Sequence, residues 1–167
     1  MIDRRELETG EAGQLLRNGL ATLSLGAAAI HFAVTADHFD EYWLSGVFFV
    51  VAAWLQTLWA VVIVTRRERS LLQVGALGNA MIVAVWVVSR TSGLPFGPDA
   101  GESQAVGLTD FAATAFESLI VLGALLLAFR PPARPASKRW LLLGTLTLAL
   151  AVISLTSVSL ALLRGAH

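Results

Sequence analysis

The sequence contains no cysteine and few charged residues. With 0 cysteines in 167 residues, disulfides, thiolate metal sites and iron–sulfur clusters are excluded. Charged residues make up 14% of the chain, whereas soluble domains carry roughly 25%. The formal net charge of +0 excludes a basic nucleic-acid-binding protein. Because 56% of the residues are hydrophobic, the chain is expected to reside in a lipid bilayer.

The sequence also lacks the short motifs of several common enzyme classes. It has no P-loop, no GxGxxG after a strand, no HExxH and no GxSxG. It shows no internal repeat, which weakens a secondary-transporter interpretation. The motifs therefore leave open whether the protein is an enzyme.

Hydrophobic segments dominate what is present. Roughly 17–25 apolar residues cross a bilayer, and five segments are long enough. They lie at about 14–38, 42–65, 70–90, 109–129 and 140–163. The sequence thus predicts an all-α, polytopic membrane protein with one five-helix transmembrane domain over residues 14–167. Residues 1–13 are expected to form an amphipathic or disordered cytoplasmic tail, and not a signal peptide, because they mix acidic with basic residues.

The basic residues predict the orientation of these helices. Ten of the twelve fall on the side of the N-terminus: Arg4, Arg5, Arg17, Arg66, Arg67, Arg69, Arg130, Arg134, Lys138 and Arg139. The positive-inside rule then places the N-terminus in the cytoplasm and, after five spans, the C-terminus outside. Lys138 is the single lysine, and this bias toward arginine is typical of GC-rich bacterial genomes. We therefore expect a multi-pass protein of the bacterial cytoplasmic (inner) membrane.

One connection, the external stretch 91–108, is much longer than the others. Gly93, Pro95, Gly97, Pro98 and Gly101 within it exclude a regular helix. Loops of this length in compact proteins are usually functional or disordered. Two interpretations are open: a loop that folds onto the membrane face of the bundle, and a flexible linker.

Ionisable residues inside two of the segments are the candidate functional groups, because hydrocarbon is a costly environment for them. His31 and His38 are seven residues apart, which is nearly two helical turns, so they share one face of the first helix. Asp110 and Glu117 have the same spacing in the fourth helix. His31 and Glu117 are each predicted to lie roughly 10 Å inside the outer surface. The two helices are therefore expected to be neighbours, with His31 opposite Glu117 and His38 opposite Asp110.

Histidine and carboxylate ligands suit copper, zinc or iron, so one hypothesis is an outward-facing metal or cofactor site for redox chemistry or metal handling. Its candidate ligands are His31, Glu117, His38, Asp110 and Glu41. His31 and His38 are roughly 10 Å apart along the helix, which is too far for one ion bound at about 2.0–2.2 Å. A single ion would therefore use either His31 with Glu117, or His38 with Asp110 and Glu41.

Two other interpretations use the same residues. The polar groups can form a structural network in a non-catalytic accessory or assembly subunit, which would act within a homo-oligomer or a larger membrane complex. Alternatively, His31, Glu117 and Arg90 can line a pathway for protons or a small ligand through the outer half of the membrane. Arg90, at the outer end of the third helix, is also a candidate charge partner for Asp110, Glu117 or an anionic ligand.

Overall fold

The computed structural model describes the backbone of residues 4–129 and 138–165, and this part of the chain is helical with no β-strand. Each of its five helices includes a stretch long and apolar enough to cross a membrane, as the sequence predicts. The helices are α1 (Arg4–Glu41), α2 (Trp43–Thr65), α3 (Arg69–Thr91), α4 (Leu108–Phe129) and α5 (Lys138–Gly165). The predicted turn at 130–137 lies outside the described residues.

Helix α1 differs most from its predicted bounds of 14–38, whereas the other four helices begin and end within two residues of theirs. It begins at Arg4, so residues 4–13 of the predicted tail belong to the helix. It continues past His38 to Glu41, because no proline or glycine interrupts the chain after Gly26. The Tyr42 N–H donates to the His38 carbonyl at 2.9 Å and closes the last turn.

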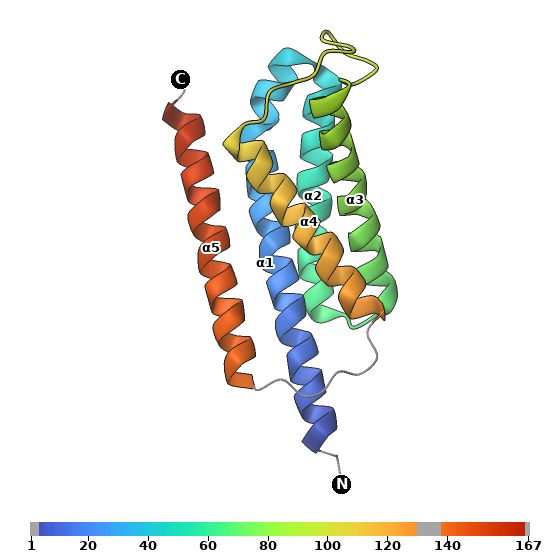
Figure 1. Ribbon diagram of the computed structural model, residues 1–167, viewed down its shortest axis with the longest axis vertical. Coiled ribbons are helices and arrows are strands. Elements are labelled where there is room, and N and C mark those ends of the chain that lie inside the picture. Colours follow the sequence, from blue (N-terminus) through green and yellow to red (C-terminus); the bar gives the residue numbers. More distant parts are fainter. Residues whose placement is uncertain (1–3, 130–137, 166–167) are drawn as a thin grey trace.

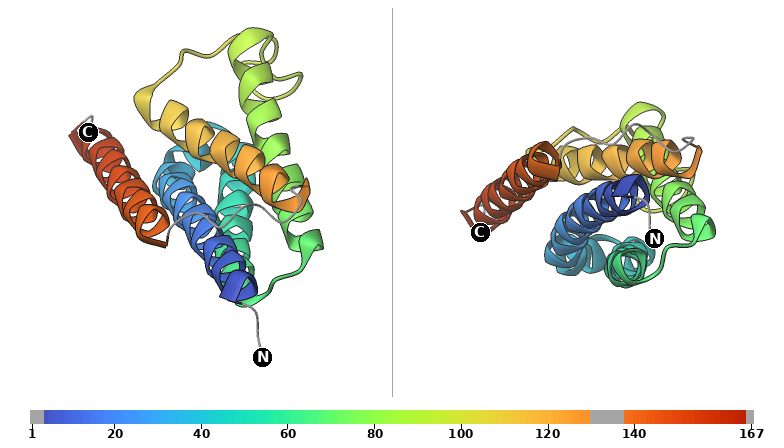
Figure 2. Two further views of the ribbon diagram at one scale, coloured as in Figure 1. Left: turned by 60° about the horizontal axis from the view of Figure 1, so that its bottom comes forward. Right: turned by 90° about the horizontal axis from the view of Figure 1, so that it is seen from below.

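The helices pack around α1, which contacts α2, α4 and α5 (Figure 1). Helix α4 crosses the bundle obliquely and packs against α3 as well as α1, whereas α5 lies at one side, next to α1 (Figure 2). Although α2 and α3 are consecutive, they contact each other little. We call residues 92–107 the long loop, and the end of the bundle that carries it, together with the α1–α2 turn, the loop end.

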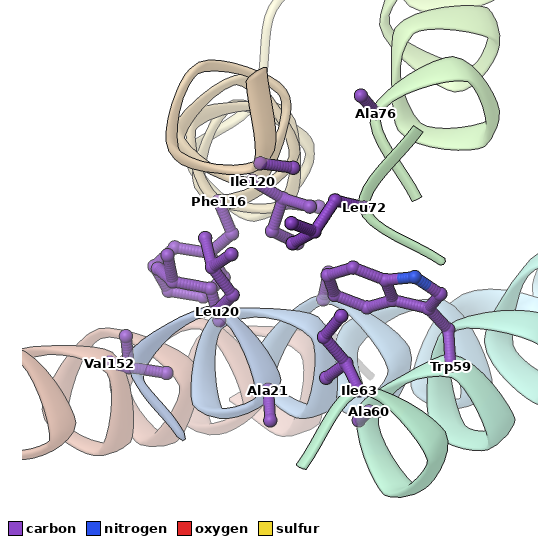
Figure 3. Close-up of a cluster of buried hydrophobic side chains, with 14 of the residues drawn as sticks. Leu20, Ala21, Trp59, Ala60, Ile63, Leu72, Ala76, Phe116, Ile120 and Val152 are labelled. Atoms are coloured by element: carbon purple, nitrogen blue, oxygen red, sulfur yellow. The ribbon is translucent and has the colours of Figure 1, made fainter. Parts of the chain in front are cut away.

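The apolar core fills the space where α1, α2, α3 and α4 converge (Figure 3). Its large members include Leu20, Trp59, Ile63, Leu72, Phe116 and Ile120. Alanines with no exposed surface, such as Ala27 and Ala112, allow the helix backbones to approach closely. Conversely, large apolar side chains such as Leu77 and Trp54 are 65% and 64% exposed on the outside of the bundle. This outward apolar surface fits a lipid environment.

At the end opposite the long loop, the buried Arg17 fastens α1 to the end of α2. Its guanidinium donates to the carbonyl oxygens of Ile63, Arg66 and Arg67 at 3.4, 3.1 and 3.2 Å. The last carbonyls of a helix have no partner within it, and they carry the negative end of its dipole. Arg17 therefore satisfies these acceptors and fixes the turn that leads into α3.

The long loop is held by hydrogen bonds and is not a flexible linker. The Gln104 N–H donates to the Ser89 carbonyl at 2.9 Å, and the Gly101 N–H donates to the Leu94 carbonyl at 2.9 Å. Gly93 has a φ of +73° and its Cα faces the loop backbone so closely that a side chain would collide with it. Phe96 is 52% exposed, so the loop covers the loop end without inserting its aromatic ring into the core.

Candidate functional site

Four buried polar side chains, one from each of the first four helices, meet inside the bundle. They form what we call the central polar cluster: His31 of α1, Gln56 of α2, Asn79 of α3 and Glu117 of α4. Their exposed fractions are 4%, 3%, 5% and 1%. Glu117 is the centre of the cluster, because its Oε1 lies 2.8 Å from His31 Nε2 and accepts a hydrogen bond from Gln56 Nε2 at 2.9 Å.

The cluster lies well inside the helices that form it. His31 is ten residues before the end of α1 at Glu41, and Glu117 is nine residues after the start of α4 at Leu108. At about 1.5 Å per residue, both lie roughly 14–15 Å from the loop-end termini of their helices. The cluster is therefore near the middle of the apolar spans.

A chain of amide groups fixes how Gln56 faces Glu117. Asn79 Nδ2 donates to the Gly75 carbonyl at 2.8 Å, which turns Asn79 Oδ1 toward Gln56. Gln56 Nε2 then donates both to Asn79 Oδ1, at 3.3 Å, and to Glu117 Oε1. This arrangement leaves the buried Gln56 Oε1 with no hydrogen-bond partner among the described residues. The Gln56 amide thus donates to the Glu117 carboxylate through Nε2 and holds the unused acceptor Oε1 beside it.

Two proton arrangements that leave the His31–Glu117 pair with no net charge fit the same contact. In one, an imidazolium N–H of His31 donates to the Glu117 carboxylate; in the other, a protonated Glu117 donates to neutral His31. They differ only by the transfer of one proton along the 2.8 Å contact. The other cluster members contribute neutral amides, and the described span of α5, Leu142–Ala161, contains no charged side chain. His31 is therefore the ionisable side chain that contacts Glu117 among the described residues.

His38 and Glu41 form a separate pair near the loop end. His38 Nδ1 lies 3.1 Å from Glu41 Oε2, and their side chains are 29% and 66% exposed. The ring of Phe49, from α2, stacks on His38 with centroids 4.2 Å apart and planes 8° apart. The same ring lies 5.3 Å from the centroid of His31. Phe49 therefore contacts both the half-buried histidine and the buried one.

Asp110 does not pair with His38 as the sequence predicts; no contact among the described residues joins them. Asp110 Oδ2 instead accepts hydrogen bonds from Arg90 Nη2 at 2.7 Å and from Trp86 Nε1 at 2.8 Å. Arg90 also donates to Gln104 Oε1, at 2.6 Å, and so ties the long loop to α3 and α4. The guanidinium of Arg90 is always charged and is a stronger partner for a carboxylate than the imidazole of His38. This difference explains why Asp110 pairs with Arg90.

The predicted metal ligands are thus divided among three places. His31 and Glu117 meet, His38 and Glu41 meet, and Asp110 belongs to the Arg90 cluster. Among the residues that the structure describes, no three His, Cys, Asp or Glu side chains are grouped so that they could hold a metal ion. Structural zinc sites use four protein ligands and catalytic ones use three. The central polar cluster supplies two conventional ligands and does not fit such a set.

Two further residues of the site carried weak sequence signals. Gln56 and Asn79 stand out as amides in apolar helices, but nothing in their spacing indicates that they face the Glu117 side chain. Phe49 is one aromatic residue among several in α2 and has no distinguishing pattern.

A comparison with protein-family models, curated proteins and solved structures finds no match to this chain.

Proposed function

We propose that this protein is a proton-binding membrane protein in which the His31–Glu117 pair takes up and releases a proton inside the bundle. The observation that carries the proposal is the 2.8 Å contact between an imidazole and a carboxylate that are both more than nine-tenths buried among apolar helices. Ionisable residues inside membrane spans commonly form proton relays. No further ligand is needed for this chemistry.

A change in the net charge of the pair would link proton binding to a rearrangement of the helices. An imidazolium with a carboxylate and a neutral imidazole with a carboxylic acid both have zero net charge. Adding or removing one proton leaves one net charge in a region of low dielectric, which costs free energy. Because the cluster joins α1, α2, α3 and α4, a rearrangement of these helices that admits water would relieve that cost. Gln56 Oε1 adds an unused acceptor where a water molecule could donate.

We infer that the site communicates with the outside of a bacterial cytoplasmic membrane. The excess of basic residues at the opposite end supports this orientation. The half-buried His38 and the exposed Glu41 lie on the same side of the cluster as the long loop. Protons would then reach the pair from the loop end.

The experiment uses the full chain in lipid nanodiscs and infrared difference spectroscopy as a function of pH. The proposal predicts a carbonyl band of a protonated carboxylic acid that changes with pH and disappears in Glu117→Gln. Glu102→Gln is the matched control, because it makes the same change in an exposed loop residue. A spectrum in which Glu117→Gln removes no titrating band would refute the proposal.

Metal handling is the second candidate, and the favouring observation is again the convergence of His31 and Glu117. It requires ligands beyond these two, for which Gln56 Oε1 is the nearest unused donor atom in the cluster. Metal analysis of the same preparation distinguishes the two functions. Stoichiometric copper, zinc or iron that is lost in His31→Ala would favour a metal site over a proton site.

The accessory-subunit interpretation predicts a different outcome for the same variants. In a purely structural network, Glu117 keeps one protonation state wherever the protein is folded, and its replacement changes stability or assembly only. Native mass spectrometry of gently extracted membranes would then show a partner or further copies of the chain. A pH-dependent Glu117 band is not expected from such a network.

A further inference from the structure

The geometry points to Phe49 as a gate between the half-buried His38 and the buried His31–Glu117 pair. This inference rests on the proposed proton-binding function, and it concerns how that site is reached. Phe49 contacts both histidine rings, at centroid distances of 4.2 Å and 5.3 Å. It carries no atom that can accept or donate a proton. A proton held by His38 therefore meets an apolar ring before it meets His31.

The spacing of the histidines makes some such element necessary. They are seven residues apart on one face of α1, which is about 10 Å along the axis. A direct hydrogen bond between them is impossible at that separation, so a proton must cross through water. The space between them on this face is where the Phe49 ring lies. Rotation of that ring away from His38 would open the space, and its return would close it.

The exposure of the groups gives the route a direction. The side chain of His38 is 29% exposed, that of His31 is 5% exposed and that of Glu117 is 1% exposed. Glu41, at 3.1 Å from His38, is the carboxylate on the water side. The Arg90–Asp110 pair at the loop end is satisfied by its own contacts and takes no part. Exposure to water thus falls from Glu41 through His38 and His31 to Glu117.

The transfer can be written with every proton accounted for. The transfer starts from the pair with one net negative charge, in which neutral His31 carries its proton on Nε2 and Glu117 is a carboxylate. With Phe49 rotated away, the His38 imidazolium releases a proton through water to Nδ1 of His31. His31 Nε2 then gives its own proton to Glu117 Oε1 across the 2.8 Å contact. The net change is that His38 becomes neutral and Glu117 becomes a carboxylic acid. His38 regains a proton from the water that surrounds Glu41.

The test measures how fast the Glu117 carbonyl band responds to a pH jump in nanodiscs. Phe49→Ala removes the ring and should speed the response about two- to tenfold, the change that corresponds to about 0.5–1.5 kcal/mol of aromatic contact. Phe49→Leu keeps an apolar side chain and replaces the alanine variant if that variant does not fold. His38→Gln should slow the response, because it removes the imidazole that collects protons.

Phe48→Ala is the matched control, since Phe48 contacts Phe49 at 5.3 Å but neither histidine ring among the described contacts. It should leave the rate unchanged. Equal rates in wild type and both Phe49 variants, or an equal acceleration by Phe48→Ala, would overturn the gate while the equilibrium band still supports proton binding. The absence of any titrating Glu117 band in wild type would instead overturn the proposed function itself.

Discussion

A double-mutant cycle on His31 and Glu117 measures how strongly the central polar cluster holds the bundle together. Glu117→Leu removes the acceptor of two interhelical hydrogen bonds, and such bonds contribute about 0.6 kcal/mol on average and at most about 1.7 kcal/mol in membranes. We therefore expect a loss of about 1–3 kcal/mol in the free energy of unfolding. His31→Leu removes one of these bonds and should cost about 1–2 kcal/mol.

The double variant is the decisive member of the cycle. Removing His31 as well leaves no buried imidazole without a partner, so the double variant should be less destabilised than the sum of the single variants by about 1 kcal/mol. Reversible unfolding in mixed micelles supplies the four free energies. The control cycle combines Ala33→Leu and Ser118→Leu, which lie next to the pair but are exposed, and it should be additive. Additive effects at His31 and Glu117 would refute the reasoning.

Two further substitutions test the packing and the long loop. Gly75→Ala should destabilise the protein by about 1–3 kcal/mol, because the new methyl group would collide with the Trp59 indole. The new methyl group of Gly78→Ala would meet no atom within 4 Å, so this variant should not be destabilised. Thermal unfolding compares the two variants. Arg90→Gln should cost about 1 kcal/mol or less, because it breaks the ion pair with Asp110 at the loop end. Hydrogen exchange in the long loop should then become faster. Unchanged exchange would contradict the role of Arg90 in tying the long loop to α3 and α4.

The five helices and the contact between His31 and Glu117 follow from the sequence for physical reasons. The length of an apolar segment is fixed by the thickness of the bilayer, and the rise of a helix fixes the depth of each residue within it. Two costly ionisable groups at equal depth on neighbouring helices lower their free energy by meeting. His31 and Glu117 lie ten and nine residues from the loop-end termini of α1 and α4, so the two side chains lie at matching positions along their helices.

The partner of His38 could not be predicted in the same way. Depth is set by spacing, but the direction in which a side chain points depends on how helices are rotated and crossed. The Phe49 ring stacks on His38, while Asp110 is taken by Arg90 and Trp86. The prediction of a metal site in this layer required His38, Asp110 and Glu41 to converge, and these competing contacts separate Asp110 from the other two.

Nuclear magnetic resonance of the full chain in lipid bilayers, with labelled histidine nitrogens and glutamate carboxyl carbons, tests the central claim most directly. The sequence has 3 histidines, so comparison with His31→Gln assigns the buried imidazole, and Glu117→Gln assigns the carboxyl. The account predicts that the His31 and Glu117 signals change together with pH while the protein stays folded. Signals from both side chains that stay constant over that whole pH range would contradict it.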